Sequence, residues 1–239
     1  MLLFYIRHGD PIYNPDSLTP LGERQAEALA KRLALYGIDK VFVSTSERAK
    51  LTAKPTCDIL RKTPVELDWA NESYAWRDLA VPYDEAGHHT WAFAIPEYRR
   101  KFNTSEVRAL GREWYEHPDF AGTSFKAGLE RVQRETDAFI ESLGYRHDLE
   151  NNVYIPTVPN EDRVALFAHQ GFGLAFLSCL LDVPYPQFAT HFDLGHSSMT
   201  VIEFRPWGDV ITPQVLQLSS DSHLYREGLP TKYQNRIYF

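Results

Sequence analysis

The sequence predicts an α/β protein of three layers, with a mostly parallel central sheet between two layers of helices. Three short apolar runs predict buried strands, at 1–6, 40–44 and 163–168. Each run is followed by a segment with the apolar spacing of a helix. Alternation of strands and helices favours a parallel sheet, because a parallel connection needs a crossover that is usually a helix.

The first half of the chain supplies two strand–helix units. Two helices and a weaker strand are predicted there, at about 20–36, 47–62 and 65–67. Thr19 and Pro20 predict the cap and first turn of the first helix. Ser46 or Thr45 can cap the second helix, and Pro55 inside it should produce a kink or an early end.

Between residues 73 and 121 the alternation lapses. This segment is rich in aromatic residues, and one or two helices are expected in it, near 96–103 and 105–116. The elements that follow are a long amphipathic helix, an apolar helix and two closing strands, at about 124–143, 172–182, 199–204 and 210–218. No repeat or linker divides the chain, so we predict one domain over 1–239 with 73–121 as an inserted helical segment.

The composition excludes several classes of function. Of the 239 residues, 44% are hydrophobic and 24% are charged, as in an ordinary soluble globular protein. The net charge is −7, and no basic run indicates nucleic acid or an anionic membrane as a partner. No stretch approaches a membrane span or a signal peptide, so we expect a cytoplasmic protein. Cys57 and Cys179 are expected to be buried, reduced thiols.

Residues of similar chemistry follow three of the predicted strands. These are Arg7-His8-Gly9, Ser44-Thr45-Ser46 with Arg48 shortly after, and His169-Gln170-Gly171. The carboxyl ends of parallel strands meet at one edge of a sheet, where open α/β sheets bind their ligands. Two of these segments run into helix N-termini, which offer free amide donors and a partial positive charge. The sequence therefore predicts a pocket for a doubly charged anion, with phosphate as the obvious candidate.

These motifs resemble those of the histidine phosphatase superfamily, which is also called the phosphoglycerate-mutase-like family. The resemblance rests on five segments in the right order: Arg7-His8-Gly9 with Asn14, Leu18–Ala26, Ser44–Ala53, Asn71-Glu72 and Ala168–Gly171. It covers the chain from the first strand to the last strands, except for 73–121. It implies that the inserted segment covers the active site.

The resemblance also implies a role for each residue. His8 would attack phosphorus as a neutral imidazole and form a phosphohistidine. Arg7, Arg48 and His169 would hold the phosphoryl oxygens and neutralise charge in the transition state. Asn14 would contact the phosphoryl group or orient its loop.

Glu72 is expected to protonate the leaving oxygen and then to activate the hydrolytic water. Apolar neighbours at Trp69 and Tyr74 suit a carboxyl group that must be protonated. The stretch after Glu72 departs from the glycine-containing stretch of many relatives. Other nearby carboxylates therefore stay as alternatives, namely Asp68, Asp78, Asp84 and Glu85.

Further polar residues are weaker candidates. Gln170 follows His169, and Arg99 and Arg100 lie in the inserted segment, where they could bind an anionic substrate. Five further histidines are read as ordinary structural residues: His88 and His89 in a solvated loop, His191 and His196 in turns, and His223 in a structural C-terminal segment.

Together these observations predict a phosphatase that acts on a small phosphorylated metabolite through His8. No metal or cofactor is expected, because arginines and histidines supply the positive charge. A phosphoglycerate-type phosphomutase shares the chemistry up to phosphohistidine, but the glycine-rich stretch of those mutases is missing after Glu72. A non-catalytic binding protein is less favoured, because His8, both arginines and His169 are all present. The sequence does not indicate an oligomeric state.

Overall fold

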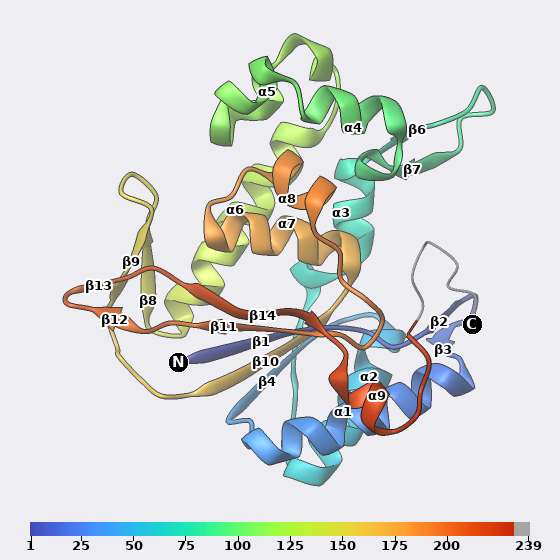
Figure 1. Cartoon of the computed structure of the whole chain (residues 1–239), viewed down its shortest axis with the longest axis vertical. Helices are drawn as coiled ribbons and strands as arrows, with labels where there is room; N and C mark the ends of the chain where they lie inside the picture. Colours follow the sequence, from blue (N-terminus) through green and yellow to red (C-terminus); the bar gives the residue numbers. More distant parts are fainter. Residues whose placement is uncertain (232–239) are drawn as a thin grey trace.

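In a computed structural model that describes residues 1–231, six strands form the central sheet (Figure 1). They are β1 (Leu2–Arg7), β4 (Lys40–Ser44), β5 (Val65–Leu67), β10 (Arg163–Ala168), β11 (Met199–Glu203) and β14 (Gln214–Ser220). Their order is β14-β11-β1-β10-β4-β5. The pairs β1–β10, β10–β4 and β4–β5 are parallel, whereas β11 is antiparallel to both of its neighbours. The predicted fold class, with its mostly parallel sheet, is confirmed.

The strand β1 lies in the middle of the sheet and is buried on both faces. Phe4 and Ile6 point into one hydrophobic core, and Leu3 and Tyr5 point into the other. A strand that is buried on both faces reads as a continuous apolar run rather than an alternating one. This is why the first six residues predict a strand so clearly.

Helices cover both faces of the sheet (Figure 1). On one side lie α1 (Pro20–Tyr36), α2 (Glu47–Leu60) and the short α9 (Ser222–Arg226); on the other lie α3 (Glu72–Leu79), α6 (Phe125–Ser142) and α7 (Gln170–Leu181). Thr19 caps α1 by accepting a hydrogen bond from the Gly22 amide, as predicted. The helix α2 continues through Pro55 and ends two residues earlier than predicted, at Leu60.

The inserted segment contains short elements. They are the hairpin β6 (Ala80–Pro82) and β7 (His89–Trp91), the helices α4 (Pro96–Phe102) and α5 (Ser105–Ala109), and 3₁₀ turns at Ala92–Ala94, Gly111–Glu116 and Pro118–Phe120. The predicted second helix is therefore α5 followed by a 3₁₀ turn. Phe102, Trp114 and Phe120 are buried together with Phe125 of α6, so part of the aromatic content forms the segment's own core.

Two predictions about strands and loops were wrong, and some elements were not predicted. The closing strand expected at 210–218 is two strands, because Pro213 interrupts the ladder. Its first residues form β13 (Val210–Ile211), in a small second sheet with β8 (Tyr145–Asp148), β9 (Val153–Pro156) and β12 (Pro206–Trp207). The polar loop expected after β1 contains the hairpin of β2 (Pro11–Tyr13) and β3 (Asp16–Leu18). The hairpin β8–β9 and the helices α3 and α8 (Tyr185–His191) have no counterpart among the predicted elements.

Cys57 and Cys179 are free and buried, as predicted. Within the described residues, none of the helices has the length and apolar character needed to cross a lipid bilayer. The predicted domain boundary at 239 lies beyond these residues, since 232–239 are outside the described part of the chain.

Candidate active site

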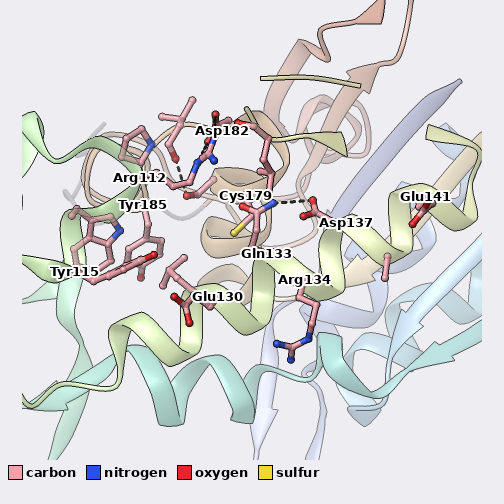
Figure 2. A pocket seen from close by; sticks show the side chains of 17 residues that line it. Arg112, Tyr115, Glu130, Gln133, Arg134, Asp137, Glu141, Cys179, Asp182 and Tyr185 are labelled. Atoms are coloured by element: carbon pink, nitrogen blue, oxygen red, sulfur yellow. Dashed lines mark hydrogen bonds and ion pairs between the residues drawn. The ribbon is translucent and has the colours of Figure 1, made fainter. Parts of the chain in front are cut away.

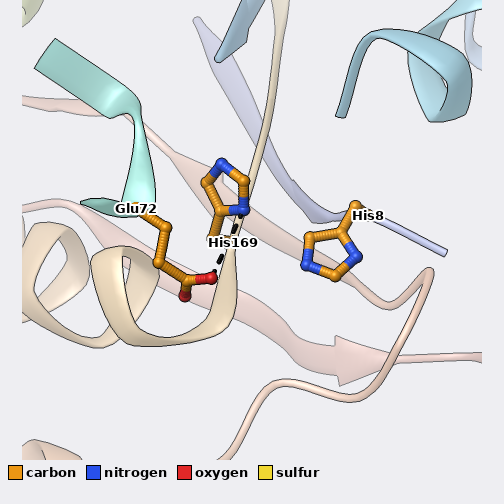
Figure 3. A group of neighbouring side chains, drawn as sticks. All are labelled: His8, Glu72 and His169. Atoms are coloured by element: carbon orange, nitrogen blue, oxygen red, sulfur yellow. Dashed lines mark ion pairs between the residues drawn. The ribbon is translucent and has the colours of Figure 1, made fainter. Parts of the chain in front are cut away.

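Two histidines follow two neighbouring parallel strands of the sheet. The strand β1 ends at Arg7, which is in register with Ala168 at the end of β10, so His8 and His169 emerge side by side. Their ring centroids are 5.3 Å apart, and both side chains are buried. Glu72, the first residue of α3, joins His8 and His169 in the candidate catalytic group shown in Figure 3. One ligand atom from each of the three side chains lies within 4.8 Å of the others.

The loop after β1 is held by close backbone packing. A Cβ atom on Gly9 would lie 2.7 Å from the carbonyl oxygen of Gly22, so the first turn of α1 can approach only a glycine. The Gly9 amide also donates a hydrogen bond to Thr52 Oγ1 of α2, at 3.0 Å. Both helices therefore fix the loop that carries His8.

The hydrogen-bond partners of His8 define its tautomer. Its Nδ1 lies 2.7 Å from the Gly9 carbonyl oxygen, which can only accept, so Nδ1 carries the hydrogen. Its Nε2 accepts from Arg48 Nε at 3.3 Å and therefore bears the lone pair. Burial, followed by the charge of Arg7, holds the pKa of His8 well below its usual range. The result is a neutral imidazole whose Nε2 bears the lone pair, which is the state that the predicted nucleophile needs.

His169 is fixed through both its backbone and its ring. The hydroxyl of Tyr5 donates to the His169 carbonyl oxygen at 2.6 Å and accepts from its amide at 3.2 Å. In the ring, Nδ1 accepts from Arg48 Nη2 at 3.2 Å, so Nε2 carries the hydrogen and donates to Ser44 Oγ at 2.8 Å. Burial and the neighbouring His8 hold the pKa of His169 well below its usual range. To donate to a phosphoryl oxygen, His169 must gain a proton on Nδ1, and a dianion beside it would stabilise that proton.

Arg48 connects the whole group. Its side chain is 12% exposed, and Nη2 also lies 3.3 Å from Glu72 Oε2. Nη1 donates to Asp16 Oδ1 at 2.8 Å, and the second oxygen of Asp16 accepts from the Glu47 amide at 2.8 Å. Asp16 thus fixes Arg48 and the N-terminus of α2 with one carboxylate. Asp16 was not a predicted site residue, because no sequence signal indicated the β2–β3 hairpin that positions it.

Arg7 lies at the other side of His8. Its guanidinium donates to the Leu194 carbonyl oxygen, and its Nη2 lies 2.7 Å from His196 Nε2. The ring of His196 is 5.8 Å from that of His8, and its Nδ1 is 3.4 Å from Asp10. His196 was read from the sequence as a turn residue only. Its place beside His8 follows from the antiparallel pairing of β11 with β1, which puts the start of β11 next to the end of β1.

Glu72 is the carboxylate that the structure brings to the histidines. Its Oε1 accepts from the Gly171 amide at the start of α7, at 2.9 Å, and its Oε2 lies 3.6 Å from His169 Nδ1. The alternative acids have other surroundings. Asp78 is bonded to Arg77 and Arg131, Asp68 to Tyr74, and Asp84 to His88, and Glu85 is exposed in the β6–β7 hairpin.

The weaker candidates lie elsewhere. Asn14 is exposed in the turn of the β2–β3 hairpin, and Gln170 donates to Asp193 Oδ1. Arg99 donates to the carbonyl oxygens of Phe93 and Thr190, and Arg100 is exposed on α4. Within residues 1–231, no hydrogen bond or ion pair joins these four side chains to the catalytic group, so their predicted binding roles stay predictions.

The other histidines have the structural surroundings expected of them. His88 is paired with Asp84 at 2.7 Å in the exposed β6–β7 hairpin, and His89 contacts the Gly87 carbonyl there. His191 is exposed at the end of α8. His223 is buried in α9 and bonded to Ser197.

The charge around the catalytic group favours an anion over a cation. His8, Glu72 and His169 are close enough together to hold one metal ion. Arg48 donates to a ring nitrogen of both histidines and to Glu72, and Arg7 directly precedes His8 in the chain. A divalent cation would meet this positive charge at close range, whereas a phosphoryl dianion would be attracted by it.

A cleft of about 600 Å³ opens beside Arg48 and Glu72. It is lined by Tyr13, Asp16, Thr45, Ser46, Glu47, Arg48, Asn71, Glu72, Ser73, Trp76 and Trp91. Two of these residues, Trp76 and Trp91, come from the inserted segment. The cleft therefore extends from the predicted phosphate pocket towards that segment.

A second cavity, of about 500 Å³, lies between α6, the end of α7 and the inserted segment (Figure 2). Two pairs of its polar residues are engaged with each other: Arg112 pairs with Asp182, and Gln133 donates to Asp137. None of the predicted catalytic residues lines it. Two of the predicted catalytic residues, Arg48 and Glu72, line the cleft described above instead.

Comparison with known proteins identifies the family of this chain. Residues 3–214 match the histidine phosphatase superfamily (branch 1), and the chain belongs to this superfamily. The comparison with curated proteins found no match.

Similar solved structures share the fold. One is the phosphoserine phosphatase of Entamoeba histolytica in complex with 3-phosphoglyceric acid, with a TM-score of 0.59 and 18% identity over 93% of this chain and 98% of that one. A mycobacterial glucosyl-3-phosphoglycerate phosphatase has a TM-score of 0.58 and 20% identity, over 92% and 98% of the two chains. The alpha-ribazole phosphatase of Shigella flexneri has a TM-score of 0.57 and 21% identity, over 92% and 97%.

Proposed function

We propose that this protein is a phosphatase that hydrolyses the phosphomonoester of a small metabolite through a phosphohistidine at His8. One observation carries the proposal. The buried His8 is neutral, its Nε2 bears the lone pair, and that nitrogen lies beside Arg48 near Glu72 and His169. The names of the similar structures, which are phosphatases of small phosphorylated molecules, support the same class of reaction.

The first step transfers the phosphoryl group to the enzyme. His8 Nε2 forms a bond to phosphorus as the bond to the leaving oxygen breaks, and protonated Glu72 gives its proton to that oxygen. Arg7, Arg48 and the protonated His169 stabilise the charge on the non-bridging oxygens. The Gly9 carbonyl holds the hydrogen on Nδ1, so the lone pair stays on the attacking nitrogen.

The second step returns the enzyme to its starting state. Glu72, now ionised, takes a proton from a water molecule that attacks phosphorus from the side of the departed alcohol. The bond between phosphorus and Nε2 breaks, inorganic phosphate is released, and His8 is again neutral. The mechanism needs no metal ion, because the arginines and His169 provide the positive charge.

The test is turnover of p-nitrophenyl phosphate, with and without EDTA, together with acid-sensitive labelling by a ³²P substrate. We expect activity that EDTA leaves unchanged and a label that His8→Ala abolishes. His88→Ala is the matched control, since His88 is exposed in the β6–β7 hairpin, and it should retain both. Equal labelling of the His8→Ala protein would overturn the proposed nucleophile. Rapid phosphoryl exchange between 2- and 3-phosphoglycerate would instead establish a mutase.

A further inference from the structure

Exposed aromatic side chains line the cleft next to the catalytic group. Tyr13, from β2, is 67% exposed, and Trp76, from α3, is 39% exposed. Large aromatic side chains are costly to leave in water, and a cleft that presents them is a usual place for a ring or another apolar group of a ligand. They differ from the buried aromatics of the inserted segment, which pack against one another.

The tryptophan wall of this cleft consists of Trp76 and Trp91, whose rings are packed against neighbouring residues. Trp76 packs edge-to-face on Trp91, with ring centroids 5.0 Å apart, and Trp91 stacks on Phe93 at 5.6 Å. The ring of Trp91 also lies against Gly171, where an added Cβ atom would be only 2.2 Å from Cζ2. The wall is thus supported from both sides before any ligand binds, which lowers the cost of ordering it.

The cleft is acidic beyond the phosphoryl position. Its lining includes Asp16, Glu47 and Glu72, and Arg48 is the one cationic side chain among the described residues that line it. Arg48 is already paired with Asp16 and Glu72. Lys50, outside this lining, is paired with Glu47 at 2.6 Å. A second anionic group on the substrate, such as a carboxylate or another phosphate, would therefore meet carboxylates and cations that are already paired with one another.

We propose that this cleft selects phosphomonoesters of uncharged alcohols that carry a ring, and that it discriminates against substrates with a second anionic group. The ring would lie on Trp76 and Tyr13, while the phosphoryl group is held by Arg48. A volume of about 600 Å³ is sufficient for one ring system with its linking atoms. The proposal rests on the proposed phosphatase function, since it concerns the alcohol that leaves.

Two pairs of esters separate the effect of the ring from that of the charge. 2-Phenylethyl phosphate and propyl phosphate are both esters of primary alcohols and differ in the ring. 3-Phosphoglycerate and glycerol 3-phosphate differ in a carboxylate. We expect kcat/KM to be about tenfold higher for 2-phenylethyl phosphate than for propyl phosphate, which is the scale of one aromatic contact. We expect it to be about tenfold higher for glycerol 3-phosphate than for 3-phosphoglycerate, which is the scale of one unpaired charge.

Variants assign each preference to its residue. Trp76→Ala should reduce the ratio of phenylethyl to propyl ester to about one, mainly through KM, if one stacking contact is lost. Trp207→Ala is the matched control, because Trp207 is 54% exposed on β12 in the small sheet, and it should leave the ratio unchanged. Glu47→Gln should raise kcat/KM for 3-phosphoglycerate about threefold relative to glycerol 3-phosphate.

The outcomes distinguish failure of this inference from failure of the proposed phosphatase function. Turnover of all four esters without either preference, or a Trp76→Ala protein with an unchanged ratio, overturns the inference and leaves the phosphatase intact. If neither p-nitrophenyl phosphate nor any of the four esters is hydrolysed, the phosphatase proposal fails, and calorimetric binding decides the inference by itself. Tighter binding of phenylethyl than of propyl phosphate to the unmodified protein would then support the selective cleft, and equal binding would overturn it.

Discussion

At the scale of single residues, Arg48 links the proposed acid, Glu72, to the proposed nucleophile, His8. The same guanidinium donates to His8 Nε2 and to Glu72 Oε2. Glu72 must be protonated to act as the acid, and a protonated carboxyl no longer forms an ion pair with Arg48. A phosphoryl dianion that enters beside Glu72 favours this protonation, because it repels the carboxylate. Substrate binding would therefore both release Arg48 Nη2 and prepare the acid.

The variant Glu72→Gln tests this double role. Gln cannot give or take a proton, so we expect turnover of alkyl phosphates to fall by about 10²–10⁴-fold, the usual contribution of general acid–base catalysis. p-Nitrophenol leaves without a proton, so p-nitrophenyl phosphate should still phosphorylate His8. Rapid-mixing absorbance should show a burst of about one equivalent of p-nitrophenol, followed by slow hydrolysis.

The burst separates catalysis from structure. Gln retains an oxygen that can accept from the Gly171 amide, so the start of α7 keeps its contact. A residue with a structural role alone would slow both steps and give no burst. Equal loss of activity towards alkyl and p-nitrophenyl esters without a burst would remove Glu72 from the mechanism. Asp78→Asn is not a suitable control, because Asp78 is buried between two arginines.

The positions of the residues that directly follow parallel strands could be predicted from the sequence better than those of the rest of the site. His8 and His169 follow apolar runs that could be assigned to neighbouring strands, so their meeting follows from the geometry of a parallel sheet. Asp16 and His196 reach the same site from a short hairpin and from the start of an antiparallel strand. Neither placement has a sequence signal, since three-residue strands show no periodicity and antiparallel pairing was not predicted.

At the scale of elements, the contact between the β6–β7 hairpin and α7 joins the inserted segment to the catalytic group. Gly171 in the first turn of α7 accommodates the Trp91 ring on one side and donates its amide to Glu72 on the other. The position of the tryptophan wall and that of the acid therefore depend on the same turn of helix.

Gly171→Ala should disturb both sides of this contact. An added Cβ atom 2.2 Å from Trp91 Cζ2 must displace the ring, at a cost of about 1–3 kcal/mol in the free energy of unfolding. In a Trp91→Ala background the same change should be neutral or stabilising by about 0.5–1 kcal/mol, because alanine favours a helix over glycine. Urea unfolding of the four proteins measures this cycle. Additive effects would show that the ring and the helix are not in the proposed contact.

The predictability of each element depended on its length and burial. The strands β1, β4 and β10 were predicted from continuous apolar runs, and the helices α1 and α6 from apolar residues at helical spacing. The strands β12 and β13 have two residues each, too few to show any alternation. The inserted segment was seen as an interruption, but its hairpin was not, because its residues pack against α7 and each other rather than on the sheet.

At the scale of the whole molecule, the C-terminal helix α9 connects the layer of α1 to the loop that carries His196. Its His223 is 3% exposed, and Ser197 Oγ, which donates to the Gln25 carbonyl, accepts from His223 Nε2 at 2.9 Å. The other ring nitrogen, Nδ1, is buried, with no partner among residues 1–231. A proton on Nδ1 would therefore be buried without an acceptor. Burial, followed by the charge of Arg32, lowers the pKa of His223 to about 4.

This lowered pKa makes the free energy of unfolding decrease as the pH falls. As the pH falls below the usual histidine pKa of about 6.5, His223 binds a proton in the unfolded chain. In the folded protein, His223 stays neutral until the pH falls to about 4. The contribution is therefore complete above pH 6.5 and is lost as the pH falls to about 4. Linkage gives a loss of about 2 kcal/mol between pH 7 and pH 5 from this group. The buried His8 and His169 act in the same direction, so the wild-type slope alone cannot assign the effect.

His223→Gln isolates the contribution of α9. The amide of Gln can occupy the place of Nε2 and donate to Ser197, but it does not titrate. Urea unfolding should show that the drop in stability from pH 7 to pH 5 is smaller in the variant by about 2 kcal/mol, even if its stability at pH 7 is lower. His191→Gln, at the exposed end of α8, should retain the wild-type drop. An equal drop in the His223→Gln protein would mean that this histidine is protonated in the fold, and that α9 does not seal it from water.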